Sequence, residues 1–166
     1  MSARTTTDGG AARRRRRSVN AIKEGLRELN GQLSLLNHHV GDRLGLRDVD
    51  LDCLDLIARH GPLSPSALAR RAGLHPATMT GVLDRLERAG WVARDRDPSD
   101  RRAVLVRPCR DRSAELFRLY AGMNRAMDRL CAGYTDEELA LIAGFLHRTT
   151  TAGKAATDAL GPTGAR

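Results

Sequence analysis

Apolar residues recur at steps of three and four along two long stretches of the chain, and this spacing predicts two long helices. The first is predicted from Val19 to Leu44. The other follows Pro108, has its apolar residues from Leu116 onward and ends at about Gly133. The apolar stripe of the first helix is longer than a small domain covers by itself, so part of it is expected to meet a second copy of the chain. Packing within one chain is the alternative.

A shorter helix is predicted after the first long one, from Val49 to His60, with a stop signal at Gly61 and Pro62. Its first turn is acidic, which suits the positive N-terminus of a helix. The carboxylates belong to Asp48, Asp50 and Asp52. A metal cluster is the alternative interpretation, and we favour charge complementarity on a solvated face.

Two further short helices are predicted between Ser64 and Gly90. Ser64 is an N-cap residue followed by proline, and Gly73 ends this third helix. The fourth helix begins at Pro76 and ends at Gly90. Its predicted buried face consists of Met79, Val82, Leu83 and Leu86. Two short helices joined by a turn that contains glycine are typical of a helix-turn-helix.

A β-hairpin is predicted directly after the fourth helix. The strands are Trp91–Arg94 and Ala103–Arg107, and residues 97–100 have the composition of a turn. A hairpin in this place is a wing, although a solvated charged hairpin is the alternative. Trp91 is expected to pack the hairpin onto the helices rather than to stack on a nucleic-acid base.

A sixth helix is predicted to open with a capping box at Thr135–Glu138, and residues from Gly153 onward are expected to fray. The predicted fold is therefore mainly α with a small hairpin wing. A disordered arm (residues 1–18) precedes one domain (19–152), and a flexible tail (153–166) follows. Within the domain we expect DNA binding from residues 49–107 and dimerisation through residues 19–46 and 109–152.

Charge is concentrated at the N-terminus of the chain. The 166 residues have a formal net charge of +8, which favours a polyanionic partner, and Arg13–Arg17 form a continuous run. With almost nothing apolar to bury, residues 1–18 are expected to be disordered. They either add phosphate contacts to DNA binding or form a solvated tail without a specific role.

Several classes of function are not expected. No apolar run approaches the roughly 18 residues of a membrane span and no secretory signal is present, which predicts a cytoplasmic protein. No phosphate-binding loop or nucleophile motif indicates an enzyme, and no cofactor is implied. Nonspecific binding of nucleic acid through the basic arm, as in a chromosome-architectural protein, is the alternative function. The aromatic content of 3% argues against binding of single strands.

The sequence D-R-L-E-R-A-G-W at residues 84–91, followed by the aspartate- and arginine-rich hairpin at 97–106, strongly resembles the MarR family of bacterial transcription regulators. The resemblance covers roughly Val19 to Thr150. It implies a homodimer held by the first, fifth and sixth helices, with a winged helix-turn-helix on each half of a palindromic operator. Many members are repressors released by small aromatic ligands, and others respond to peroxide or zinc.

Candidate DNA contacts follow from the buried face of the fourth helix, which leaves its other side for bases and phosphates. Base contacts are expected from His75, Ala77, Thr78 and Thr80, and phosphate contacts from Arg85 and Arg88. In the wing, the resemblance puts Arg94, Arg96 and Arg101 near phosphates and Arg102 in the minor groove. Asp100 lies two residues before Arg102 and shares its face of an extended strand, so it can hold that guanidinium in place.

Two positions depart from the family pattern. Gly81 stands where relatives often carry a longer polar or basic side chain. It either allows close approach to DNA or contacts no base. Pro108 and Cys109 stand where relatives usually begin the fifth helix with Leu-Thr, which leaves the start of that helix open.

The residues that could sense an effector are less distinctive. The family's ligand cleft implies Asn37, His38, Cys53 and Tyr120 as candidates for a small aromatic effector. His38, His39 and Asp42 include an i, i+4 pair that could bind a metal, but ordinary surface polarity is favoured and no metal site is predicted. Cys109 lies beside arginines and is the best-placed thiol for a redox switch, although an inert thiol is favoured.

Overall fold

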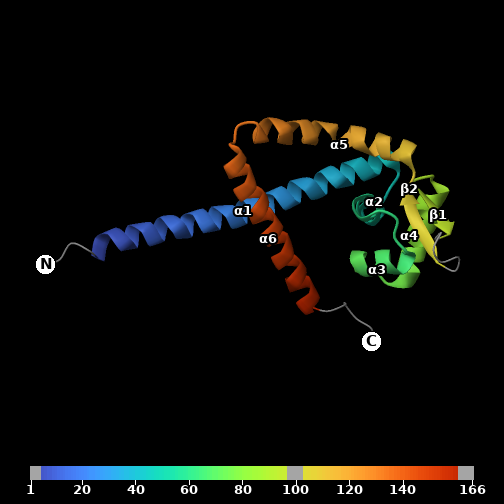
Figure 1. Ribbon diagram of the computed structural model, residues 1–166, viewed down its shortest axis with the longest axis horizontal. Coiled ribbons are helices and arrows are strands. Elements are labelled where there is room, and N and C mark those ends of the chain that lie inside the picture. Colours follow the sequence, from blue (N-terminus) through green and yellow to red (C-terminus); the bar gives the residue numbers. More distant parts are fainter. Residues whose placement is uncertain (1–4, 97–102, 161–166) are drawn as a thin grey trace. The chain divides into compact units, whose positions relative to one another are not determined.

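The computed structural model describes residues 5–96 and 103–160 and confirms a mainly helical fold with a hairpin (Figure 1). The described elements are helices α1 (Thr5–Leu44), α2 (Asp48–His60), α3 (Pro65–Ala72) and α4 (Pro76–Arg88), strands β1 (Val92–Arg96) and β2 (Val104–Pro108), and helices α5 (Arg110–Cys131) and α6 (Asp136–Leu160). The chain divides into two units, Met1–Leu51 and Asp52–Arg166, and each is considered by itself.

Helix α1 begins at Thr5 and not at Val19. The expectation of a disordered arm therefore differs from the structure over residues 5–18, which are helical. Alanine and arginine are among the strongest helix formers, and no proline interrupts the stretch from Ala11 to Ser18, so the helix of the apolar stripe extends backwards through the arginines. The hydroxyl of Ser18 donates to the carbonyl of Arg14 at 3.2 Å within this helix.

The end of α1 is closed by a tight turn that depends on two glycines. Gly45 has a φ of 66°, and the amide of Leu46 donates to the carbonyl of Gly41 at 2.9 Å. A Cβ on Gly41 would lie 2.7 Å from the carbonyl oxygen of Leu46 and 3.4 Å from the Leu51 side chain. The turn into α2 therefore requires glycine at position 41, for space and not for conformation.

The acidic first turn of α2 differs in one respect from the predicted solvated face. Asp50 is only 2% exposed, and its Oδ2 accepts a hydrogen bond from the amide of Arg47 at 3.2 Å. Asp50 thus satisfies one of the amides that a helix N-terminus leaves without an intrahelical partner. Asp48 and Asp52 are exposed, as expected.

The helix-turn-helix has the predicted caps and the predicted core. Ser64 Oγ accepts from the amide of Ala67 at 3.2 Å, and Gly73 ends α3 in the left-handed conformation with a φ of 65°. Helix α3 packs against α4 and β2, and α4 packs against β1. The predicted inner face of α4 is confirmed, because Met79, Val82, Leu83 and Leu86 are all buried.

The hairpin is a two-stranded antiparallel sheet, and its strands begin one residue later than predicted. Arg94 pairs with Val106 and Val92 with Pro108. Leu63, in the segment between α2 and α3, exchanges two backbone hydrogen bonds with Val106 (3.1 and 2.8 Å). This isolated bridge joins the root of the hairpin to the start of the helix-turn-helix.

The last two helices differ in how their N-termini are capped. Cys109 is the N-cap residue of α5, and the predicted capping box opens α6: Thr135 N donates to Glu138 Oε2 at 2.9 Å and Glu138 N donates to Thr135 Oγ1 at 3.3 Å. Helix α6 continues to Leu160, beyond the fraying expected from Gly153. Neither helix contains a buried residue. Among the described residues, no helix is both long and apolar enough to span a membrane.

Gly41→Ala is expected to lower the free energy of unfolding by about 1 to 3 kcal/mol, because the added methyl group meets backbone that cannot move aside cheaply. Urea denaturation followed by far-ultraviolet circular dichroism measures the change. The matched control is Gly81→Ala in α4, where a Cβ would meet only the end of the Arg85 side chain at 3.8 Å. The control should gain about 1 kcal/mol from helix propensity. Equal effects at the two positions would contradict the packing argument.

Candidate nucleic-acid interface

The first turn of α4 presents polar groups outward and is fixed by its own side chains. His75 is the N-cap residue, and its Nδ1 accepts from the amide of Ala77 at 3.3 Å. The hydroxyl of Thr80 donates to the carbonyl of Pro76 at 3.1 Å. Ala77, Thr78 and Thr80 are exposed, as predicted for base contacts. With Nδ1 acting as an acceptor, the neutral ring carries its proton on Nε2, which can donate to a phosphate or a base.

The arginines predicted to contact phosphates from α4 differ in their surroundings. Arg88 lies exposed in the last turn. Arg85 is half-buried, and its Nη1 donates to the carbonyl of Gly81 at 3.1 Å. Nothing in the described chain prevents a Cβ at Gly81, so any requirement for glycine there must come from a bound partner.

Arg94 lies between two carboxylates of α4. Its Nη2 is 2.6 Å from Asp84 Oδ1 and its Nη1 is 3.3 Å from Glu87 Oε2. The Arg94 side chain is 28% exposed, whereas both carboxylates are more than a third exposed. The resemblance implies a phosphate contact for Arg94, but the structure shows Arg94 connecting the wing to α4, the recognition helix of the helix-turn-helix. We call these three residues the wing clamp.

Strand alternation explains why Arg94 faces α4. Val92 is buried, and residues two apart in a strand share a face, so Arg94 lies on the side of the hairpin that meets the helix. Its partner in the register, Val106, is completely buried. This pattern of a buried valine followed two residues later by arginine was a usable signal in the sequence. Asp84 and Glu87, at i and i+3 on α4, were not predicted as partners.

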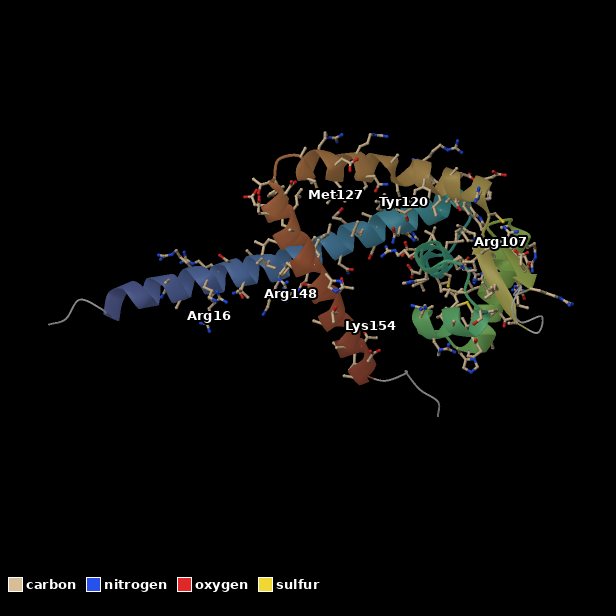
Figure 2. All side chains as sticks on the ribbon, viewed as in Figure 1. Arg16, Arg107, Tyr120, Met127, Arg148 and Lys154 are labelled. Carbon is tan, nitrogen blue, oxygen red and sulfur yellow. The ribbon has the colours of Figure 1, made fainter. Side chains whose placement is uncertain are left out.

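The other face of the hairpin carries an exposed ion pair between Asp95 and Arg107, and Arg107 is labelled in Figure 2. The hydrogen bond that Arg107 Nε donates to Asp95 Oδ2 is the main reason that the pKa of Arg107 is raised. Arg107 is charged at neutral pH in any case, so the pair leaves little net positive charge at the middle of the hairpin. Arg96, at the end of β1, is exposed and was predicted to lie near phosphates.

The tip of the wing lies outside the described residues. Asp100, Arg101 and Arg102 all belong to this segment, so their predicted contacts and the predicted pairing of Asp100 with Arg102 stay predictions.

Trp91 joins the recognition helix to α5, and its predicted role in packing is confirmed by an exposure of 1%. Its amide donates to the carbonyl of Leu86 at 2.8 Å, and its carbonyl accepts from the amide of Cys109 at 2.9 Å. The guanidinium carbon of Arg112, in the first turn of α5, lies 4.1 Å from the centroid of the indole ring. Glu115 holds Arg112 from the other side, with Oε2 2.6 Å from Nη1. Sequence reasoning did not identify Arg112.

The residues expected to line an effector cleft lie on three helices. Asn37 and His38 belong to α1, the buried Cys53 to α2, and Tyr120 to α5. Burial raises the pKa of the Tyr120 hydroxyl, and the charges of Asp55 and Asp52 raise it further. The grouping of these residues into one pocket stays a prediction.

The predicted i, i+4 pair of His38 and Asp42 is present, with 3.6 Å between Nε2 and Oδ2. Asp48 lies on the other side of the imidazole, 3.4 Å from Nδ1. Within the described residues, no group of three or more histidine, cysteine or acidic side chains could hold a metal ion. Cys109 is a half-buried free thiol, and whether peroxide oxidises it stays a prediction.

The chain is similar to known proteins in sequence and in fold. The profile of the MarR family matches residues 46–104. The HTH-type transcriptional regulator YcgE of Bacillus subtilis is 35% identical over 120 residues, which cover 72% of this chain and 78% of that protein. The transcriptional repressor YetL of the same organism is 31% identical over 63% of each chain. A MarR family protein from Bacillus stearothermophilus has the same fold, with a TM-score of 0.64 at 21% identity over 84% of this chain and 97% of that one.

Arg94→Gln is expected to lower the free energy of unfolding by about 1 kcal/mol or less, since solvent screens both carboxylates of the wing clamp. Binding to DNA should weaken because the wing is no longer held against α4. The slope of log K against log salt concentration should stay unchanged, as Arg94 does not itself neutralise a phosphate. A slope smaller by about 0.9 would instead show the direct phosphate contact that the resemblance implies. Arg107→Gln, which removes the exposed pair, is the charge-matched control and should leave the midpoint of unfolding nearly unchanged.

Proposed function

The chain belongs to the MarR family of helix-turn-helix transcriptional regulators, and from this premise we propose that it is a repressor that binds a palindromic operator as a homodimer and responds to a small aromatic ligand. The observation that carries the proposal is the wing clamp. It holds a charged hairpin against the helix whose first turn exposes His75, Thr78 and Thr80.

Sequence-specific contact is supported by the kinds of groups on α4. Hydroxyl groups can contact base edges or phosphates, and the methyl groups of Ala77 and the threonines can contact the methyl group of thymine. Few long side chains are available for bidentate contacts to bases on this turn. We therefore expect modest direct readout and a large contribution from DNA shape, which the wing would sense in the minor groove.

Repression is supported by the names of two relatives. YetL and MdtR, both from Bacillus subtilis, are transcriptional repressors, and MdtR is 28% identical to this chain over 98 residues. A regulator bound at a promoter would repress by occupying the DNA there.

Dimerisation is supported by apolar side chains that one chain leaves in solvent. Phe117 on α5 is 66% exposed and Leu141 on α6 is 68% exposed. Further exposed apolar residues on α1, α5 and α6 are Val19, Ile22, Leu29, Leu33, Met127, Leu130, Ile142 and Leu146. Extended apolar surface of this kind on a protein in water is normally covered by a partner. A second copy would supply matching stripes and, by its symmetry, would match a palindrome.

An aromatic effector is supported by the chemistry of Tyr120. Its half-buried side chain combines a phenolic hydroxyl with an aromatic face that can pack against a flat ligand. We expect such a ligand to bind near Tyr120 and Cys53 and to weaken DNA binding.

Selection of bound duplexes from a random DNA pool is expected to yield a palindrome with half-sites about one helical turn, roughly 34 to 36 Å, apart. Two protomers should bind each selected duplex, which light scattering of the complex measures. Recovery of random sequences, or of an asymmetric site bound by one protomer, would contradict the proposal. The same selection with a chain that lacks residues 1–17 should yield the same palindrome. This control separates sequence-specific recognition from nonspecific attraction by the arginines.

Arg102→Ala is expected to weaken operator binding by about 1 to 3 kcal/mol without unfolding the protein, because it removes the guanidinium assigned to the minor groove. A mobility-shift titration measures the affinity, and circular dichroism verifies the fold. Arg129→Ala, an exposed position in the last turn of α5, is the control for the loss of one charge. Unchanged affinity of the Arg102 variant would refute the assignment.

A further inference from the structure

The arginine run Arg13–Arg17 forms about 1.4 turns of helix α1 and is exposed to solvent. All five residues are exposed, and Figure 2 shows the labelled Arg16 side chain extending from the helix. No function of the helix-turn-helix and wing described above uses this segment. Because the backbone is helical, the directions in which the five side chains leave the axis are set.

The arginine run has no carboxylate among its nearest neighbours on helix α1. In a helix, the neighbours of a side chain are three and four residues away. For Arg13–Arg17 these positions fall within residues 9–21, which include no aspartate or glutamate. In the described part of the chain, none of the five arginines takes part in an ion pair, whereas the next arginine along the helix, Arg27, pairs with Glu24 at 2.9 Å. The run is therefore a self-repelling cluster that an external polyanion would stabilise.

Three of the five arginines share one face. Arg13, Arg16 and Arg17 have the i, i+3, i+4 spacing that places side chains together on a helix surface. Guanidinium groups form two parallel hydrogen bonds with phosphate oxygens, which suits a row of phosphates. The opposite face, with Arg14 and Arg15, is also basic, so the segment can meet a duplex in more than one rotation.

The surroundings of the arginine run favour DNA over a membrane surface. A helix that lies on a membrane buries an apolar face between the head groups. Around the run the only apolar residues are Ala11 and Ala12, and the large apolar side chains begin at Val19. Nothing large is available to insert among lipids.

We infer that the arginine run is a second, sequence-independent DNA-binding element, in which the helical face of Arg13, Arg16 and Arg17 contacts backbone phosphates. The inference rests on the proposed function, because it requires double-stranded DNA as the partner. Such an element raises affinity for every sequence and makes binding more dependent on salt, but it does not select the operator.

The test compares full-length protein with the variant R13Q/R16Q/R17Q on a duplex of arbitrary sequence, with affinity measured between 50 and 200 mM salt. Glutamine keeps a helix propensity close to that of arginine, so only the charge changes. Three lost phosphate contacts should reduce the salt slope by about 2.7, so that the unmodified protein loses about 40-fold more affinity than the variant over this range. Circular dichroism should show equal helix content in the absence of DNA.

The matched control is R118Q/R125Q/R129Q, which removes the same charge from exposed positions on α5 and should leave the slope unchanged. Equal slopes for the unmodified protein and the run variant would overturn the inference. So would a variant with normal DNA binding that no longer binds vesicles containing phosphatidylserine. Because the duplex has an arbitrary sequence, the result does not depend on the operator: random-pool selection can fail while this measurement succeeds, and the reverse.

Discussion

The burial of Trp91 is the constraint on which the arrangement of the winged helix-turn-helix depends. Its amide donates to the carbonyl of Leu86 at the end of α4, and its carbonyl accepts from the amide of Cys109, the N-cap residue of α5. The guanidinium of Arg112 lies over its ring. A buried aromatic ring removes about 150 to 250 Å² of surface from water, so displacing it is costly. The recognition helix, the wing and the long helix that leaves the wing therefore meet at one residue.

Apolar packing positions the wing, and charge then refines it. Val92 and Val106 lie at the root of the hairpin and are buried, and each fully buried side chain of this kind contributes about 1.5 to 3 kcal/mol. The wing clamp contributes less, since exposed carboxylates are screened by water and typical pairs contribute about 0 to 1 kcal/mol. The wing clamp instead fixes the orientation of the hairpin. Arg94 can pair with both Asp84 and Glu87 only when the hairpin lies along the last two turns of α4.

The sequence was sufficient for several features that local chemistry sets. The caps at Ser64 and Thr135 and the buried face of α4 follow from hydrogen-bonding rules and helical periodicity, which involve residues close in the chain. The role of Arg94 was missed because ten residues separate it from Asp84, and the pairing exists only after the hairpin folds back. Gly41 was missed for a similar reason, as its neighbour is a carbonyl in the following turn. The start of α1 was placed too late because a low apolar content indicates disorder, although alanine and arginine also favour helix.

The contact between Trp91 and Arg112 also limits how α5 can move. Arg112 stacks on the indole ring of Trp91 and is paired with Glu115. The amide of Cys109 also donates to the carbonyl of Trp91, so two contacts join the start of α5 to this residue. A shift of this turn would have to move Trp91, break the stacking, or be absorbed between Pro108 and Arg110. Moving Trp91 would disturb the hydrogen bond to Leu86 that ends α4. Helices α5 and α6 contain no buried residue. The contact of Arg112 with Trp91 therefore links the first turn of α5 to the helix-turn-helix.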